Sequence, residues 1–258
     1  MIQYNTIING IPVQAHYTEE SVEKIFLPLL RRLSALEREK GRRILAMLAA
    51  PPGSGKSTLA GFLQVLASQV REREPEIVPI TVIGMDGFHR YQDDLLAART
   101  IRDGKEISLV QIKGAPITFD LNRLRERISR VARGEECGWP EYNRLLHNPV
   151  ENAVVVRGNM VLLEGNYLLL DREGWRDLSQ YADYTIRITG KEETLKKRLV
   201  ERKISSGTEP GEALRFVEYS DLANVRECLK YTKKADLNLT VDEYGIYHYA
   251  AEGLAENQ

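Results

Sequence analysis

A glycine-rich segment just before a helical pattern carries the clearest chemistry in the chain. It reads Pro52-Gly53-Ser54-Gly55-Lys56-Ser57-Thr58. Gly53 and Gly55 allow backbone conformations that point successive N–H groups into one concavity, and the positive end of the following helix faces the same point. Lys56 can reach the β- and γ-phosphates, and the Ser57 hydroxyl can ligate Mg²⁺. The segment therefore predicts a site for a nucleoside triphosphate.

One position departs from the usual phosphate-loop pattern. The eight-residue motif begins with glycine, whereas this chain has Ala50 there. Alanine fits a tight turn only with a negative φ, so we expect that conformation at Ala50.

Two acidic residues follow apolar runs that read as buried parallel strands. Asp86 comes after residues 77–85, and Glu164 comes after residues 160–163. Ligands collect at the carboxyl ends of such strands. Glu164 then has the place of an acid that organises Mg²⁺ through water, and Asp86 begins a polar loop with His89, Arg90 and Tyr91. The alternative is that both acids have purely structural roles: Asp86 would cap a turn, and Glu164 would be exposed at the end of a strand.

The elements around these residues predict an α/β fold with three layers and a mainly parallel sheet flanked by helices. The apolar run 44–49 precedes the glycine segment, and a helix with apolar residues at helical spacing follows it. Residues 182–189 and 235–241 supply further core strands. Asp120 is placed to cap a helix over 121–131. Residues 139–147 look too aromatic and polar for an ordinary strand, and 212–229 read as a helix.

Both flanks of this core have distinct patterns. Asn9-Gly10 between β-prone runs predicts a hairpin, and Thr18, with Ser21 competing, caps a helix that Pro28 should kink or delay. Residues 1–40 are expected to be an extension that covers the sheet, and 41–258 the nucleotide domain. A basic helix over 192–205 and the flexible stretch 205–211 predict a mobile lid at about 191–212.

Composition narrows the classes of function. The 258 residues carry a formal net charge of −1 and 28% charged residues, which gives no sign of a nucleic-acid or anionic-membrane partner. The longest apolar stretch, 154–170, is interrupted by charged residues and cannot span a bilayer. No signal-peptide pattern begins the chain, and Cys137 and Cys228 are too far apart for a metal-binding pair, so we expect a cytoplasmic protein with reduced thiols.

Taken in order, these segments resemble the small-molecule kinase branch of phosphate-loop proteins, which includes uridine kinase, phosphoribulokinase and bacterial pantothenate kinase. The resemblance covers residues 42–241. Besides the glycine segment, its motifs are 84–91, Gly114-Ala115-Pro116 with Phe119-Asp120, Pro140 with Tyr142-Asn143 and His147, Glu164-Gly165, and Arg198 with Arg202. Asn143 stands where Asp is commoner, and the further Arg-Asp pair of uridine kinases is absent. Ser220-Asp221 and Asn224 are more similar to the pantothenate kinase side.

The resemblance implies ATP and Mg²⁺ as cofactors and a small molecule with a hydroxyl group as phosphate acceptor. Asp86 would accept the proton of that hydroxyl, Lys56 would bridge the phosphates, and Arg198 and Arg202 would close over the γ-phosphate. Mg²⁺ would be held by Ser57 and Glu164. The residues implied for the acceptor are Arg90, Tyr91, Tyr142, His147, Asn166 and Tyr167.

Several alternatives stay open from the sequence. The acceptor is a nucleoside, a pantothenate-like acid or a sugar, and the oligomeric state is undecided, with a homodimer among the choices. The rival function is a nucleotide-dependent switch that forms no phosphorylated product. The chain has neither the Asn-Lys-x-Asp motif of GTPases nor the Leu-Ser-Gly-Gly-Gln stretch of transporter ATPases.

Overall fold

A six-stranded sheet forms the centre of the molecule in the computed structural model, which describes residues 1–8 and 11–250. The strand order is β12-β11-β10-β3-β9-β4, and every neighbouring pair is parallel except β11 with β12. The strands are β3 (Ile44–Ala49), β4 (Ile80–Gly84), β9 (Met160–Gly165), β10 (Tyr184–Gly190), β11 (Leu237–Val241) and β12 (Tyr247–Tyr249). The predicted α/β fold with a mainly parallel sheet is confirmed.

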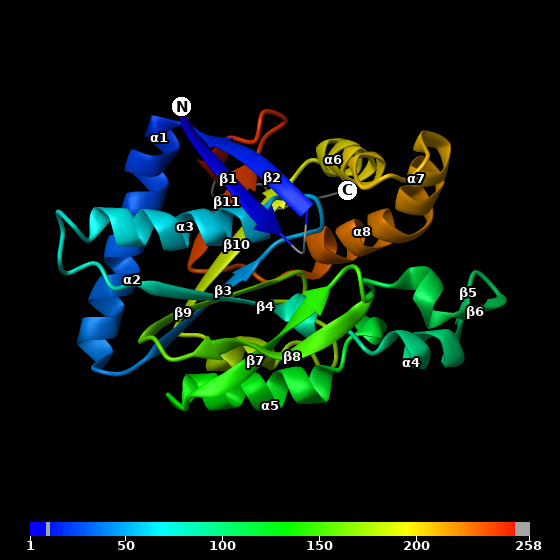
Figure 1. The fold of residues 1–258 in the computed structure, drawn as a ribbon, viewed down its shortest axis with the longest axis horizontal. Helices are drawn as coiled ribbons and strands as arrows, with labels where there is room; N and C mark the ends of the chain where they lie inside the picture. Colours follow the sequence, from blue (N-terminus) through cyan, green and yellow to red (C-terminus); the bar gives the residue numbers. More distant parts are fainter. Residues whose placement is uncertain (9–10, 251–258) are drawn as a thin grey trace.

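Helices cover both faces of this sheet, as Figure 1 shows. β3 is buried along its whole length, which is expected of a strand covered on both sides. Alternate β3 residues enter two different cores: Ile44, Ala46 and Leu48 on one face, and Leu45, Met47 and Ala49 on the other. The first core also contains α2 (Leu27–Lys40) and α3 (Lys56–Val70), and the second contains α5 (Leu121–Ala132).

The N-terminal segment packs into the first core. β1 (Ile2–Ile8) pairs antiparallel with β2 (Ile11–Tyr17), as the hairpin prediction requires, and the Asn9-Gly10 turn itself lies outside the described residues. The Tyr17 ring stacks on Phe62 of α3 at 4.1 Å between centroids. Residues 1–40 therefore share a core with the phosphate-loop helix, and the domain division at residue 40 stays a prediction.

The helix after this hairpin begins where its cap predicts. The Thr18 hydroxyl accepts a hydrogen bond from the Ser21 N–H at the start of α1 (Glu19–Ser21). A π-helical turn, η1 (Val22–Phe26), then leads into α2, with Pro28 in the first turn of α2. The backbone is already helical before Pro28, so the helix is not delayed, and the wider π-helical turn in front of Pro28 accommodates a residue without an N–H.

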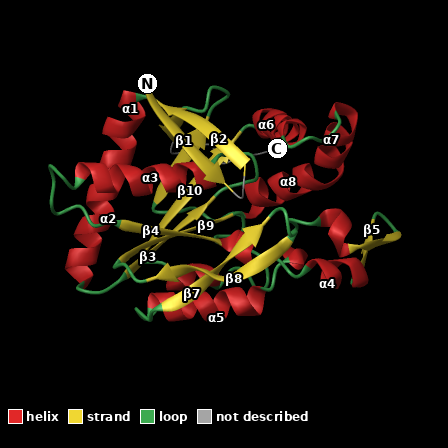
Figure 2. Cartoon of the chain, viewed as in Figure 1, coloured by secondary structure: helices red, strands yellow, loops and turns green. Residues whose placement is uncertain are grey.

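A second hairpin corrects the prediction for residues 139–147. β7 (Cys137–Asn143) is a strand that pairs antiparallel with β8 (Asn148–Val156), and this long hairpin lies below the sheet in Figure 2. Its polar residues are compatible with a strand because only one side of the hairpin is covered. The Trp139 indole N–H donates to the Gly84 carbonyl at 2.8 Å, and a register shift between Trp139 and Glu141 accommodates Pro140, which has no N–H.

The remaining elements form two outlying parts. Helix α6 (Glu192–Ser205) has the predicted bounds, and the helical stretch after it begins earlier than predicted, at Pro210, and includes a π-helical turn. Its pieces are α7 (Pro210–Phe216), η6 (Val217–Asp221) and α8 (Leu222–Tyr231). The second part contains α4 (Gln92–Ala97), β5 (Arg99–Arg102), β6 (Lys105–Ser108), η3 (Leu109–Ile112) and η4 (Pro116–Thr118). The 3₁₀ turn η5 (Leu178–Tyr181) belongs to neither part and comes between β9 and β10 in the chain. Each part has its own small apolar cluster.

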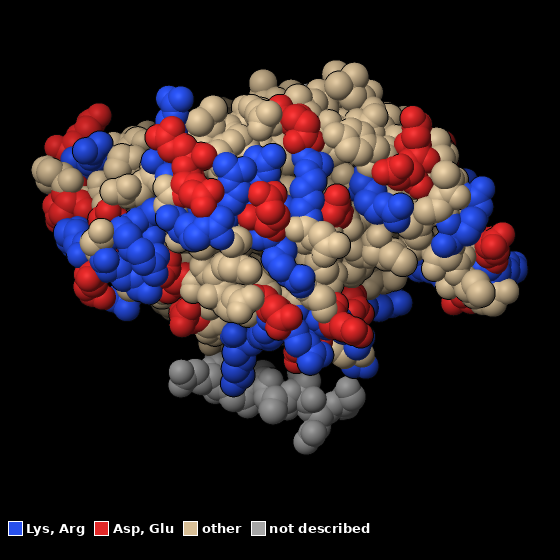
Figure 3. Space-filling view, turned by 90° about the horizontal axis from the view of Figure 1, so that it is seen from below, with Lys and Arg blue, Asp and Glu red and all other residues tan. Residues whose placement is uncertain are grey.

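The surface has mixed charge on the face that carries α5. Figure 3 shows basic and acidic side chains interspersed there. Arg130, for example, pairs with both Glu126 and Glu135. Among the described residues, no helix combines the length and the apolar character that crossing a membrane requires.

Candidate active site

The phosphate-binding loop has the geometry that its sequence predicts. Gly53 and Gly55 both have φ +82°, a conformation that favours glycine, and α3 begins at Lys56. A Cβ on Gly53 would also lie 2.9 Å from the Leu195 carbonyl oxygen, so helix α6 packs directly on this loop. Ala50 has the expected negative φ, and its N–H donates to the Gly165 carbonyl at 3.4 Å.

Ser57, in the first turn of α3, meets Glu164, near the end of β9. The Ser57 hydroxyl donates to Glu164 Oε1 at 2.9 Å. Glu164 is only 7% exposed, and its second oxygen, Oε2, is buried without a hydrogen-bond partner. Burial raises the pKa of Glu164, and Asp86 adds to that rise, whereas Lys56 and the Ser57 hydroxyl oppose it. A cation at this point would satisfy the buried oxygen.

The residues present fit Mg²⁺ bound together with a triphosphate. Mg²⁺ is usually held by one or two protein oxygens plus substrate phosphates and water. Ser57 and Glu164 supply that small set. In the described chain, no group of three or more His, Cys, Asp and Glu residues could hold a metal alone, which agrees with a site completed by the nucleotide.

Asp86 lies at the carboxyl end of β4, one strand from Glu164. It belongs to the 3₁₀ turn η2 (Met85–Phe88) rather than to the strand, and its side chain is partly exposed. Burial would raise the pKa of Asp86, but nearby positive charges outweigh it and hold the pKa below the usual range. These are Lys56 first, then His89, Arg144 and Arg202. Lys56, Ser57, Asp86 and Glu164 together are called the candidate catalytic cluster below.

Tyr142 and His89 form one wall beside Asp86. Their rings meet edge to face at 5.2 Å, and His89 stacks on Phe119 at 4.0 Å. Burial lowers the pKa of His89 to about 4, so this imidazole is neutral at neutral pH. Burial also raises the pKa of Tyr142, and Asp86 contributes to that rise. Tyr142 therefore lies close to the candidate catalytic cluster, and its role in binding the acceptor stays a prediction.

The two arginines of α6, Arg198 and Arg202, have different surroundings. Arg202 acts on Asp86 electrostatically; the protein around Arg202 removes part of its hydration and lowers its pKa, and Arg144 adds to that effect. Arg198 instead donates to the Asp242 carbonyl at 2.8 Å, in the turn between β11 and β12. Arg202 thus lies within electrostatic range of Asp86, while Arg198 holds α6 against the C-terminal hairpin of β11 and β12.

Arg144 is a site residue that the sequence analysis did not identify. It lies at the end of the β7–β8 hairpin, two residues after Tyr142, and its charge acts on Asp86, Arg202 and Asp221. Its one local signal is the two-residue spacing from Tyr142, which places two side chains on the same face of a strand, but the sequence analysis did not expect a strand in this segment.

Three of the residues implied for the acceptor point elsewhere. Arg90 and Tyr91 line a cavity of about 320 Å³ at the start of α5, which Asp86 does not line. The Tyr91 hydroxyl donates to Glu151 at 3.2 Å. Tyr167 is completely buried, and its hydroxyl donates to the Gly114 carbonyl at 2.7 Å, so it supports that loop and is closed to an acceptor.

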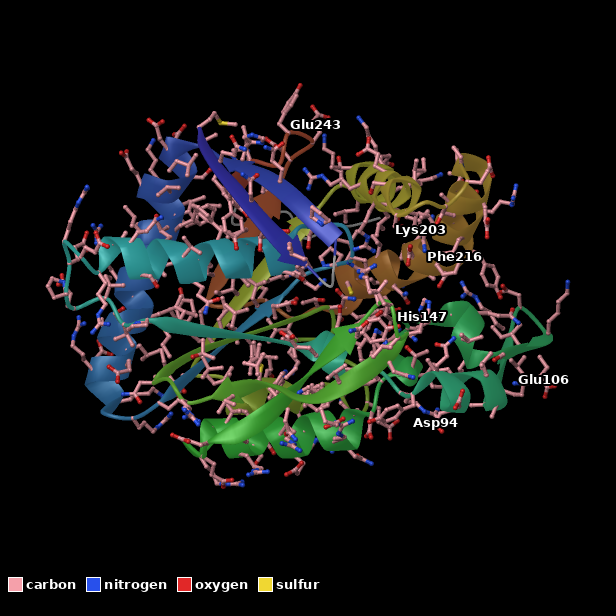
Figure 4. All side chains as sticks on the ribbon, in the orientation of Figure 1. Asp94, Glu106, His147, Lys203, Phe216 and Glu243 are labelled. Atoms are coloured by element: carbon pink, nitrogen blue, oxygen red, sulfur yellow. The ribbon has the colours of Figure 1, made fainter. Side chains whose placement is uncertain are left out.

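Asn166 and His147 complete the set. Asn166 is 8% exposed, and its Oδ1 is buried without a hydrogen-bond partner. This oxygen, two residues after Glu164, can therefore accept a hydrogen bond from a bound molecule. Figure 4 shows His147 at the end of the β7–β8 hairpin. Its side chain is exposed, its φ is +51°, and its carbonyl accepts a hydrogen bond from Lys113 Nζ at 2.9 Å.

These features define a phosphate-loop protein with an acid facing the phosphate site, and comparisons with known proteins agree. The chain is 39% identical over 245 residues to the uncharacterized protein YggC of Escherichia coli (strain K12), covering 95% of this chain and 98% of that one. It is 31% identical over 192 residues to a putative uridine kinase of Schizosaccharomyces pombe, covering 71% and 77%. A pantothenate kinase of Klebsiella pneumoniae is 30% identical over 208 residues, covering 71% of this chain and 62% of that protein.

Solved structures support the same assignment. A putative fructose transport system kinase from Silicibacter sp. TM1040 superposes with a TM-score of 0.66 at 32% identity, over 80% of this chain and 98% of that one. YFH7 of Saccharomyces cerevisiae shares the fold, with a TM-score of 0.66 at 17% identity, over 84% and 98%. No family model matches the chain. The protein belongs to the P-loop kinase family that includes uridine kinases and pantothenate kinases.

Proposed function

We propose that the protein is an ATP-dependent kinase that transfers the γ-phosphoryl group to a hydroxyl group of a small metabolite. The observation that carries this proposal is the position of Asp86. Its ionised carboxylate lies within the electrostatic reach of Lys56, beside the Ser57–Glu164 pair. A protein that only binds a nucleotide has no need of such an acid, and a hydrolase would use it to position water, so dependence on an acceptor is what separates the kinase from a hydrolase.

The phosphate loop would hold the triphosphate through backbone N–H groups and Lys56. Ser57 and Glu164 would hold Mg²⁺, whose charge, when bound, neutralises negative charge on the transferred group. The hydrogen bond from the Ser57 hydroxyl holds the Glu164 carboxylate in one orientation. The two carboxylate oxygens would therefore already be oriented when the nucleotide binds.

Asp86 would align the acceptor hydroxyl and take its proton. Phosphoryl transfer passes through a loose transition state and depends mainly on positioning and charge stabilisation, so the base can act late. A pKa below the usual range suits this role because the carboxylate is then ready at neutral pH. Arg202 would reach the transferred group when the lid closes and water is excluded.

The names of the relatives span different acceptors: a putative uridine kinase, pantothenate kinases and a putative fructose transport system kinase. What they share is transfer to an alcohol group, and that shared chemistry supports the proposal.

The test is acceptor-dependent ADP formation across a panel of nucleosides, sugars and hydroxy acids, with identification of the phosphate ester. Asp86→Asn is the blank and is expected to lower kcat by roughly 10² or more, the effect of removing one well-placed catalytic group. ATP hydrolysis that no acceptor stimulates, and that Asp86→Asn leaves unchanged, would instead support a nucleotide-dependent switch.

A further inference from the structure

We propose that the acceptor carries a negatively charged group in addition to its reacting hydroxyl, and that Arg144 binds this group. The inference rests on the proposed kinase function and defines its substrate class. The anion is a carboxylate or a phosphate, since both offer the paired oxygens that a guanidinium binds through two hydrogen bonds.

Close packing of the β7–β8 hairpin against the turn that contains Asp86 fixes the position of Arg144. A Cβ on Gly87 would lie 1.9 Å from the Pro140 carbonyl oxygen, so strand and turn are in direct backbone contact. Two residues further along, Tyr142 contacts the His89 ring. Arg144 follows after two more residues, where the hairpin ends beside the lid.

Among the residues that the structure describes, Arg144 has no acidic partner at contact distance. Within the described residues it forms no ion pair, and its Nε is buried without a hydrogen-bond partner. Arg226, by contrast, pairs with Glu192 at 2.7 Å, and Arg172 pairs with Glu227 at 2.7 Å. A buried donor without a partner is costly, so such a group at a binding site is expected to find its partner in the ligand.

The other cations near Arg144 have roles already. Lys203 lies over the Phe216 ring at 3.6 Å, and the two side chains are neighbours in Figure 4. Arg202 is the residue proposed for the transferred phosphoryl group. Lys113, over the Tyr142 ring at 4.8 Å, donates to Gln92 Oε1 and to the His147 carbonyl. Arg144, whose charge also acts on Tyr142, is therefore the cation left for the acceptor itself.

Asp221 limits what kind of anion fits. Its Oδ2 is buried without a partner, and burial raises its pKa against the opposing effect of Lys203, Arg202 and Arg144. A free carboxylate oxygen here calls for a donor on the ligand, such as a second hydroxyl. The combination of Arg144 and Asp221 describes a hydroxylated anion rather than a simple apolar acid.

The experiment uses sets of related acceptors in which one member is neutral and the others carry an anionic group. These are glycerol with glycerate and with glycerol 3-phosphate, ribose with ribose 5-phosphate, and panthenol with pantothenate. Binding is measured by calorimetry on the Asp86→Asn protein with Mg²⁺ and a non-hydrolysable ATP analogue, so that the result does not depend on turnover. Activity is measured on the protein with Asp86 intact. The carboxylate and phosphate members show which anion is preferred.

We expect an anionic member to bind more tightly than its neutral partner. Arg144→Gln should raise its Kd and KM roughly 10- to 100-fold, the range for losing a charged hydrogen-bonded group, and leave kcat and the KM for ATP nearly unchanged. Arg144→Lys should restore part of the loss. Arg157→Gln, which removes an exposed arginine paired only with Glu136 at 3.5 Å, is the matched control and should have no effect. Thermal unfolding checks that each variant is folded.

The outcomes separate this inference from the proposed function. Phosphorylation of neutral alcohols as efficient as that of their charged partners overturns the inference and leaves the kinase intact. Arg144-dependent binding of an anion without any phosphate ester overturns the kinase and leaves the anion site. Failure of every anionic member to bind at millimolar concentration overturns the inference.

Discussion

The Tyr247 hydroxyl donates a hydrogen bond of 3.2 Å to the backbone carbonyl of Ser54, in the middle of the phosphate-binding loop. Tyr247 is 5% exposed, and its ring meets Phe26 edge to face at 5.7 Å and stacks near Tyr17 at 6.3 Å. A residue of the C-terminal hairpin, held by aromatic residues of the N-terminal segment, thus fixes a carbonyl of the nucleotide site.

Tyr247→Phe should therefore weaken ATP binding while the core stays packed. The phenyl ring keeps the aromatic contacts, and only the hydrogen bond to Ser54 is lost, which is worth about 1 kcal/mol. We expect the KM for ATP to rise roughly three- to tenfold with a smaller change in kcat. Tyr249→Phe is the control, because the Tyr249 hydroxyl, on the same strand, bonds the Lys24 carbonyl. Equal effects of the two variants would contradict a positioning role for Tyr247.

Ser57→Ala and Glu164→Gln should raise the Mg²⁺ concentration needed for half-maximal activity. Each removes one partner of the 2.9 Å bond between the two residues and changes the oxygens offered to the cation. The expected rise is roughly 10- to 100-fold for each, as for other residues that orient metal ligands. Because the residues act as a unit, the double variant should lose less than the product of the single losses. Full additivity, in Mg²⁺ titrations of the three proteins, would argue against a shared metal site.

Gly87→Ala should separate the β7–β8 hairpin from the turn that contains Asp86. The added methyl group would lie 1.9 Å from the Pro140 carbonyl oxygen, and neither backbone can yield without moving Asp86 or Tyr142. We expect a loss of about 1–3 kcal/mol in the free energy of unfolding, measured in urea, and a large loss of activity. Gly104→Ala is the comparison: its φ of +75° brings strain of about 1 kcal/mol, but open space surrounds it, so activity should persist.

Local signals in the sequence were sufficient for the nucleotide half of the site. The glycine segment, the apolar run before it and the acids at 86 and 164 are each readable over a few residues, because parallel strands end at a common edge. Thr18 and Asp120 likewise form the predicted caps, since a capping bond spans only three residues.

The acceptor half depends on contacts between distant segments and was harder to predict. The packing of Pro140 against Gly87 brings the charge of Arg144 into range of Asp86. Pro140 and Gly87 are more than 50 residues apart in the sequence, so no local pattern encodes this contact. Tyr167 follows the Glu164 motif directly and looks available in sequence, but the aromatic packing around Trp175, at 5.4 Å, closes it off.

Arg202→Gln should mainly lower kcat, whereas Arg198→Gln should mainly lower stability, although both residues are on α6. Arg202 acts on Asp86, so its loss should lower kcat by roughly 10² or more with little effect on stability. Arg198 donates to the Asp242 carbonyl, so its loss should cost about 1 kcal/mol of stability and reduce kcat less. Steady-state kinetics and urea unfolding on both proteins check this. A larger kcat loss for Arg198→Gln would show that the lid rearranges to bring Arg198 to the phosphates.

His89 should make the protein sensitive to mild acid. It is 8% exposed, its Nδ1 has no partner, and burial lowers its pKa from 6.5 to about 4. Between those values the unfolded chain binds a proton at this residue and the folded protein does not, so the stability is present above pH 6.5 and falls as the pH drops toward 4. From pH 7 to pH 5 this one group should cost about 2 kcal/mol of unfolding free energy. His89→Gln should remove that part of the decline, while His147→Gln, which replaces an exposed histidine, should keep it. Urea unfolding at the two pH values measures the difference, and parallel declines in the original protein and in His89→Gln would show that His89 is not held neutral by its burial.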